Sequence, residues 1–344
     1  MEGCPRRAPT PGAAPATAQG PPHRSPPAAS STPRPAMPVQ SGEYSHTRMD
    51  EVLIRGATNA DLPRVAAIWY QAATEGESNP PPSRGVPSLY VHELDTHELV
   101  VLERDDTVIA YAAIINRGTI AFLADLFVDS AYRSAGFGWR LLEAVLPRDG
   151  RVCCTVASND PRALPLYVRS GMRPCWPHVH LRAETAKVGP LPAVDVETLE
   201  ADPDDSDWVR WDTEISGRPR PEDRKYWISR RRGVPLWFRR AGRIVGYGMA
   251  QRLSDDSVWH ADALTLGPIG ALERGHAVDC VLAAVHWARA RAHIVRISLT
   301  GPHPAIAPLH SAGFRIVEVE MFCSNTSEPF VDVERYVSSG GDLF

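Results

Sequence analysis

The chain has 344 residues and a formal net charge of −4, and 43% of its residues are hydrophobic. That length is sufficient for two domains of ordinary size, each with a core of its own. The small negative charge gives no electrostatic reason to expect nucleic acid or an anionic membrane as a partner, and no apolar run approaches the roughly 20 residues that span a bilayer. We therefore expect a globular protein of the cytoplasm.

Residues 1–48 contain 11 of the 32 prolines and almost no aliphatic side chains larger than alanine. Such a segment cannot repay the entropy lost on ordering, so we expect a disordered tail. Prolines interrupt the run after Arg6 and Arg7, which argues against a secretory signal. A transit peptide, and a translation start at Met37 or Met49, stay open as alternatives.

The segment 51–183 is predicted to alternate strands and helices. In chain order we expect a strand at 51–55, a helix from 62, a short amphipathic segment at 89–94, a hairpin of 97–103 and 107–115, a strand at 119–128, a helix at 139–146, a strand at 151–157, a helix at 160–169 and a strand at 172–182. Gly189, Pro190 and Pro192 mark a linker at 184–194.

The second half repeats the first in weakened form. Residues 241–248, 281–285 and 305–314 parallel residues 105–112, 141–145 and 163–172, at offsets that rise from 136 through 140 to 142. Small insertions between two copies produce such a slow rise. We therefore predict a duplicated domain at 195–325, followed by a C-terminal tail at 326–344.

A turn rich in glycine joins the strand that ends at 126–128 to the next helix. It reads Arg133-Ser134-Ala135-Gly136-Phe137-Gly138. Glycine lets a ligand approach the backbone closely, successive N–H groups can point into one hollow, and the helix start adds the positive end of its dipole. The turn is typical of a site for phosphate-like charge.

The six cysteines show neither a C-x-x-C pair nor histidine partners at zinc spacing. They are Cys4, Cys153, Cys154, Cys175, Cys280 and Cys323. The histidines of the second half likewise lack a ligand spacing with an acidic partner. We expect reduced, structural thiols and no bound metal.

With these motifs in place, residues 51–183 resemble the GNAT family, the GCN5-related N-acetyltransferases. One signature is Arg133-x-x-Gly136-x-Gly138; the other is Asn159-x-x-x-Ala163-x-x-x-Tyr167-x-x-x-Gly171-Met172, where the family commonly ends in Gly-Phe. The resemblance implies an α/β fold with a mixed sheet, and two tandem acyl-CoA N-acyltransferase domains. Residues 51–183 would be the catalytic copy.

The resemblance also implies the binding of acetyl-CoA as co-substrate. The pyrophosphate would lie on the turn formed by Arg133, Ser134, Ala135, Gly136, Phe137 and Gly138. The pantetheine arm would pair with the backbone of Leu126, Phe127 and Val128, in a gap between strands 119–128 and 151–157. A backbone N–H near Phe127 would polarise the thioester. Asn159 would bond the pantetheine amides, or serve as a plain turn residue.

Two residues carry the proton transfers that the resemblance implies. Tyr167 would be the general acid toward the CoA sulfur, with a tyrosine packed in the core as the alternative. Asp125 would act as base on the amine, directly or through water, and a capping or salt-bridged aspartate is its competitor. The reaction would be direct attack by the amine on the thioester.

The second copy lacks the residues that the resemblance assigns to the site. Glu273 stands where the first copy has Arg133, Leu309 replaces Tyr167, and Gly301 replaces Asn159. We predict a degenerate second copy. For the acceptor we expect a primary amine of a small molecule; a protein N-terminus or lysine, or a non-catalytic module that binds acyl-CoA, are the alternatives. The sequence gives no indication of the oligomeric state.

Overall fold

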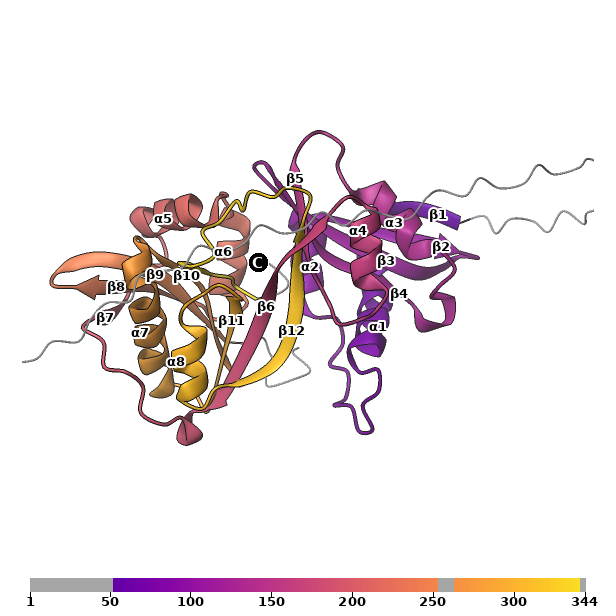
Figure 1. Cartoon of the computed structure of the whole chain (residues 1–344). Helices are drawn as coiled ribbons and strands as arrows, with labels where there is room; N and C mark the ends of the chain where they lie inside the picture. Colours follow the sequence, from indigo (N-terminus) through magenta and orange to yellow (C-terminus); the bar gives the residue numbers. More distant parts are fainter. Residues whose placement is uncertain (1–51, 253–262, 341–344) are drawn as a thin grey trace, which may run out of the picture. The chain divides into compact units, whose positions relative to one another are not determined.

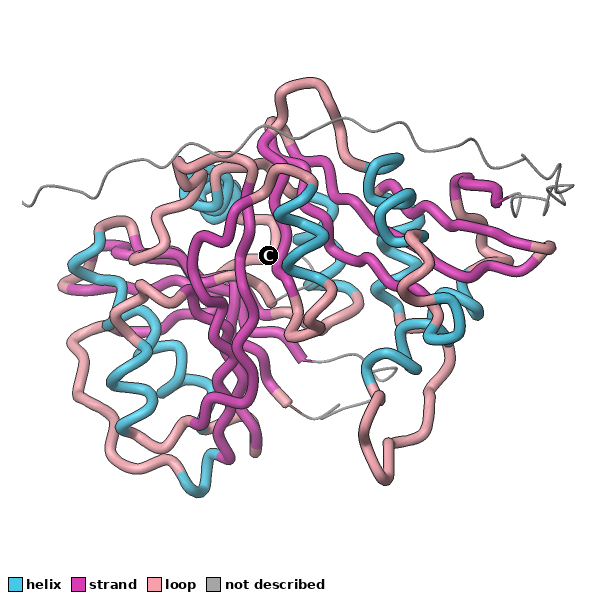
Figure 2. The backbone as a smooth tube through the Cα atoms, turned by 45° about the vertical axis from the view of Figure 1, so that its right-hand side comes forward, coloured by secondary structure: helices cyan, strands magenta, loops and turns pink. Residues whose placement is uncertain are grey.

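A computed structural model describes residues 52–252 and 263–340, and these form one continuous mixed sheet with helices on both faces (Figure 1, Figure 2). The predicted α/β class is confirmed. The tail expected at 1–48 lies outside the described residues. Within the described ranges every helix is too short or too polar to cross a bilayer.

The first half follows the predicted order. Its elements are β1 (Val52–Gly56), α1 (Leu62–Ala73), α2 (Ser88–Thr96), β2 (Glu98–Arg104), β3 (Thr107–Arg117), β4 (Ile120–Val128), α3 (Phe137–Val145), β5 (Val152–Ala157), α4 (Ala163–Arg169) and β6 (Arg173–Glu184). Helix α1 begins with a proline in its first turn and buries Leu62, Val65 and Ala66 on one stripe.

The second half repeats this order, beginning with β7, α5 and α6 in the places of β1, α1 and α2. Its elements are β7 (Glu197–Glu200), α5 (Ser206–Ser216), α6 (Pro221–Ser229), β8 (Val234–Arg240), β9 (Arg243–Arg252), β10 (Leu264–Ala271), α7 (Ala277–Arg289), β11 (Ile294–Thr300), α8 (Ile306–Ser311), β12 (Arg315–Ser324) and β13 (Tyr336–Val337). The run β8-β9-β10-α7-β11-α8-β12 thus corresponds to β2-β3-β4-α3-β5-α4-β6.

The two halves exchange their last strands. The strand order is β1-β2-β3-β4-β5-β12-β6-β11-β10-β9-β8-β7. Strand β6 of the first half pairs with β11, and β12 of the second half pairs with β5. Figure 1 shows β6 and β12 side by side where the halves meet. The predicted linker at 184–194 therefore connects two halves that share one sheet, and each half completes its sheet with the other's strand.

Helices α2 and α6 also join the halves. Nε2 of His92 lies 3.0 Å from Oδ1 of Asp223, and the His92 ring stacks on Tyr226 at 4.5 Å between centroids. Arg117 donates to the same Asp223 oxygen from Nη2 at 2.9 Å. Burial opposes ionisation of this carboxyl, but the hydrogen bonds from His92 and His97, together with Arg117, hold the pKa of Asp223 well below its usual range.

Candidate functional site

Strands β4 and β5 part halfway along their length, in a feature that we call the first fork. They pair in parallel only from Ile120 opposite Val152 to Leu123 opposite Thr155. A bulge follows at Ala124, since Leu123 and Asp125 pair with consecutive residues of β3. Beyond the bulge β4 pairs, among the described residues, with β3 alone, while β5 keeps its pairing with β12 on its other edge as far as Ala157. The predicted gap between the two strands is present.

The N–H groups of β4 point alternately toward β3 and toward the fork. The N–H of Asp129 donates to Ile109 of β3 at 2.9 Å, so the N–H of Phe127, two residues earlier, points to the same side. The N–H groups of Leu126 and Val128 therefore point into the fork. The N–H expected near Phe127 to polarise the thioester would therefore belong to Leu126 or Val128, because the direction of the N–H groups alternates along a strand.

The glycine turn lies directly after this strand. Ser134 and Gly136 adopt left-handed φ values of 65° and 85°, and Gly136 is the N-cap of α3. A Cβ at Gly136 would meet no atom within 4 Å, so the turn opens to free space. Phe137 is buried in the core beneath the turn, which fixes the start of the helix. The turn thus presents the N-terminus of α3 to anything held at the fork.

The side chain of Arg133 supports the turn. Its Nε donates to the carbonyl oxygen of Val128 at 3.1 Å, and its Nη1 pairs with Glu75 at 2.5 Å. The neighbouring Asp129 accepts from the N–H of Ala131 and pairs with Arg64. These contacts hold the turn against the end of β4 and the segment after α1. The predicted phosphate contact of Arg133 would come from a guanidinium already fixed in place.

Tyr167 lies at the base of the fork. Thr155 donates to the carbonyl oxygen of Leu123 at 2.8 Å, where the strands part, and Tyr167 lies close enough for the Thr155 hydroxyl to lower the pKa of its phenol. Burial raises the pKa of the Tyr167 phenol, and the charge of Asp125 acts in the same direction. The phenol therefore stays protonated at neutral pH, which a general acid must be before it reacts.

Asp125 belongs to a group of aromatic side chains beside the fork. Tyr111 donates to its Oδ2 at 3.5 Å, and the hydroxyls of Tyr111 and Tyr90 lie 2.8 Å apart. Burial, and then the charge of Asp125, raise the pKa values of both tyrosines. Phe127 stacks on Tyr111 at 5.6 Å. The sequence did not predict the role of Tyr90 and Tyr111, because no spacing brings them to Asp125.

The remaining predicted residues are placed as follows. Asn159 is exposed just after β5, and Ser134 and Ala135 are exposed in the turn. A Cβ at Gly138 would touch Val128 and Leu166 at 3.6 and 3.7 Å, which is ordinary contact. The structure thus brings the turn, the edge of β4, Tyr167 and Asp125 to one fork, with Asn159 at the end of its other strand.

A second fork exists in the second half, and it is filled. Strand β10 pairs with β11 only from Leu264 to Leu266, and from Ile269 it pairs with β13 instead. The side chain of Arg335 donates to the carbonyl oxygen of Leu272 at 2.7 Å. Tyr336 and Val337 are fully buried. The segment expected only as a C-terminal tail lies where the fork would otherwise be open.

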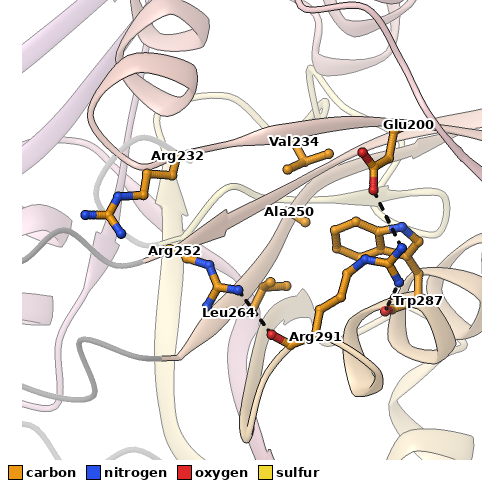
Figure 3. A pocket seen from close by; sticks show the side chains of 8 residues that line it. All are labelled: Glu200, Arg232, Val234, Ala250, Arg252, Leu264, Trp287 and Arg291. Atoms are coloured by element: carbon orange, nitrogen blue, oxygen red, sulfur yellow. Dashed lines mark hydrogen bonds and ion pairs between the residues drawn. The ribbon is translucent and has the colours of Figure 1, made fainter.

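Two surface pockets lie elsewhere in the second half. One, of about 140 Å³, is shown in Figure 3. It is lined by Glu200, Arg232, Val234, Ala250, Arg252, Leu264, Trp287 and Arg291. Arg291 lies over the Trp287 ring at 4.2 Å. The other, of about 440 Å³, lies between residues 193–198 and α7. Neither contains a predicted site residue.

Comparison with known proteins agrees with this geometry. The sequence model of the acetyltransferase (GNAT) family matches residues 65–172. No curated protein matches the chain in sequence.

Several solved structures share the fold. A putative acetyltransferase from Pyrococcus horikoshii is 16% identical with a TM-score of 0.66, over 89% of this chain and 100% of that one. A GCN5-related N-acetyltransferase from Sphaerobacter thermophilus is 18% identical with a TM-score of 0.54, over 83% and 98%. A tandem GNAT protein from the clavulanic acid biosynthesis pathway is 15% identical with a TM-score of 0.57, over 81% and 99%. The tandem GNAT fold is confirmed.

Proposed function

We propose that the chain transfers an acetyl or short acyl group from CoA to a primary amine, and the match of residues 65–172 to the sequence model of the acetyltransferase (GNAT) family supports this proposal. The observation that supports this proposal most is the first fork. There an unpaired strand edge, an open glycine turn and a buried, protonated phenol lie at one place.

Binding of acetyl-CoA follows from two features of the fork. The pyrophosphate fits the exposed turn from Ser134 to Gly136, where the N-terminus of α3 favours negative charge. The amides of the pantetheine arm resemble peptide groups, so the arm can pair with the edge at Leu126 and Val128 as an added strand would.

The reaction is direct acyl transfer. The neutral amine nitrogen attacks the thioester carbon, and the proton that it loses as the C–N bond forms passes to Asp125, directly or through water. An N–H of the β4 edge stabilises the oxyanion. As the C–S bond breaks, the CoA sulfur takes a proton from Tyr167, which lies at the base of the fork. The phenol and the carboxylate then exchange protons with solvent.

The surroundings of Asp125 favour a small acceptor over a protein. Aromatic rings border the carboxylate, and Tyr111 bonds to it. Helix α2 beside them is fixed to the second half, since Ser88 lies 3.2 Å from the hydroxyl of Tyr226 and His92 bonds to Asp223. A small diamine can reach such a fixed surface without moving it. Comparison of kcat/KM for small diamines and for peptides would distinguish the two acceptor classes.

The first test of function changes Tyr167 to Phe. We expect turnover, followed as release of free CoA thiol over a panel of amines, to fall about 10- to 100-fold, because the leaving thiolate loses its proton donor. The Kd of acetyl-CoA should stay nearly unchanged. Tyr132→Phe, just before the turn, is the matched control and should keep full turnover. Tight binding of CoA without thiol release for any amine would instead support a regulatory module.

We also propose that the second copy binds no CoA. Its fork is filled by β13. Arg274, beside the corresponding turn, pairs with Asp332 at 2.7 Å and with Glu334 at 3.0 Å. Both the strand edge and this arginine are thus already engaged within the chain. One acetyl-CoA per chain is the expected stoichiometry.

A further inference from the structure

Two histidines and a glutamate meet on the exchanged strands. His178 and His180 lie two residues apart on β6, so their side chains share one side of the sheet, and Glu320 of β12 is opposite His178. Glu320 follows His178 by 142 residues, as Ala305 follows Ala163. The two residues therefore occupy equivalent positions in the two copies. The group therefore lies where the two exchanged strands, β6 and β12, pair with each other.

The distances within this group suit a metal ion. Nε2 of His180 lies 2.7 Å from Oε2 of Glu320, and Nδ1 of His178 lies 3.9 Å from the same oxygen. All three ligand atoms lie within 4.8 Å of one another. Ligands about 2.1 Å from a tetrahedral zinc are about 3.4 Å apart, so the two measured distances bracket the required value.

Both imidazoles are oriented by their other ring nitrogen. Nε2 of His178 lies 2.8 Å from the hydroxyl of Ser338, and Nδ1 of His180 lies 2.8 Å from the hydroxyl of Ser298. The hydroxyl of Ser338 also lies 3.5 Å from the carbonyl oxygen of Ser298. With the proton of His178 on Nε2, donated to Ser338, its Nδ1 would direct a lone pair to an ion held by the carboxylate. Histidines that bind metals are commonly held in this way by a second hydrogen bond.

A second group of two histidines and a carboxylate lies where α2 meets α6, and it differs in the cation that it holds. His92, His97 and Asp223 also lie within 4.8 Å of one another. There Nη2 of Arg117 lies 2.9 Å from both Nε2 of His97 and Oδ1 of Asp223, so the cation is a guanidinium. Among the described residues, the ion pairs recorded for Glu320 are with the two histidines. In the group on the exchanged strands, two imidazoles thus stand where the other group has a guanidinium.

We propose that His178, His180 and Glu320 bind one divalent cation of the zinc class, which ties β6 of the first half to β12 of the second. Imidazole nitrogen with carboxylate oxygen suits Zn²⁺ or Co²⁺. His178 is fully buried, whereas the side chains of His180 and Glu320 are 13% and 16% exposed. The ion enters from the exposed side, where water completes its coordination. This site does not depend on the proposed transferase activity.

The experiment uses the full chain, treated with a chelator and then dialysed against Zn²⁺, with bound metal measured by elemental analysis. We expect about one ion per chain, and Co²⁺ in its place should give the absorption spectrum of a low-symmetry site. His180→Gln and Glu320→Gln should each weaken binding about 100-fold or more, with circular dichroism unchanged. His92→Gln, in the group that holds Arg117, is the matched control and should bind as the parent does.

Three results would overturn the proposal. They are no binding by the parent chain, equal binding by all variants, or equal loss in the His92 control. Should the two site variants fail to fold, the parent chain alone decides the question. Its Co²⁺ spectrum and the shift of its histidine ring resonances on adding Zn²⁺ either show imidazole ligation or show that it is absent.

Discussion

The two forks arise from the same local geometry and differ in what occupies them. In each, a parallel strand pair of the sheet parts after a few residues. The first leaves a strand edge beside an open turn, whereas the second receives β13, which supplies the missing partner. The fork is therefore a property of the fold. Function depends on whether the chain leaves the edge free or covers it with its own backbone.

The electrostatic surroundings differ in the same sense. Arg133 is held by Glu75 and a carbonyl beside the turn that carries Gly136. In the second copy Arg274 is engaged by two acidic residues of the C-terminal segment. A ligand phosphate would meet one carboxylate beside Arg133 and two beside Arg274. The comparison predicts one working site, and four changes can break or sharpen it.

The largest expected effect is on cofactor binding. Gly136→Glu places a side chain and a negative charge in the turn, at a φ of 85° that side chains disfavour. We expect the Kd of acetyl-CoA, measured by calorimetry, to rise by about 1,000-fold or more, about 4 kcal/mol. Gly275→Glu makes the same change at the corresponding turn of the second copy and should leave the Kd unaltered. Equal effects would mean that both turns bind.

The next change weakens the segment that fills the second fork. Tyr336→Ala removes a fully buried ring from the segment that fills it. The free energy of unfolding, from urea titration, should fall by about 3 to 4 kcal/mol because a large cavity forms. Binding stoichiometry should stay at one acetyl-CoA per chain. A rise to two would show that β13 merely covers a second working site.

The third change removes a buried ion pair that joins the two halves. Asp223→Asn removes the nearer carboxylate of Arg117 where α2 meets α6, and leaves only the half-exposed Glu222 at 3.7 Å. We expect a loss of about 3 kcal/mol in unfolding free energy, since removing one partner strands a buried charge. The exposed pair of Asp149 with Arg151 gives the control, and Asp149→Asn should cost less than about 0.5 kcal/mol. Similar losses in both would refute a special role for the contact.

The smallest effect concerns pH. Burial lowers the pKa of His303 to about 4, whereas the unfolded chain has an ordinary histidine value near 6.5. The unfolded state therefore binds more protons between these values, and stability falls as the pH drops from about 6.5 toward 4. At pH 5 the loss should be about 2 kcal/mol relative to pH 7.5. In His303→Gln this part of the pH dependence should disappear.

The sequence predicts the elements of the first half and the glycine turn well, since both depend on local patterns. It does not predict the strand exchange. The alternation in β6 and β12 specifies which residues face the core, but not which neighbouring strand they join. The contact of His92 with Asp223 spans 131 positions and leaves no local signal. Likewise, β13 consists of two residues, too few for a strand pattern.

The sequence also missed the paired histidines of β6. A zinc site is recognised in sequence by short spacings among cysteines and histidines. His178 and His180 are instead separated by one residue in a strand. Their carboxylate partner is 140 positions away from His180. Only the exchange of strands brings it to them. The prediction of no bound metal was made from spacings in the sequence, and these do not contain this arrangement.

The exchanged strands have a consequence for how the protein is made. Ala157 ends a strand whose partner, at Met321, is translated only after most of the second half has emerged. During synthesis the sheet of the first half, including the fork, lacks β12 until that strand has been translated. A chain that stops early would lose the first site along with the second half, although the signature motifs of that site lie upstream. Each copy depends on the other for one strand of its sheet.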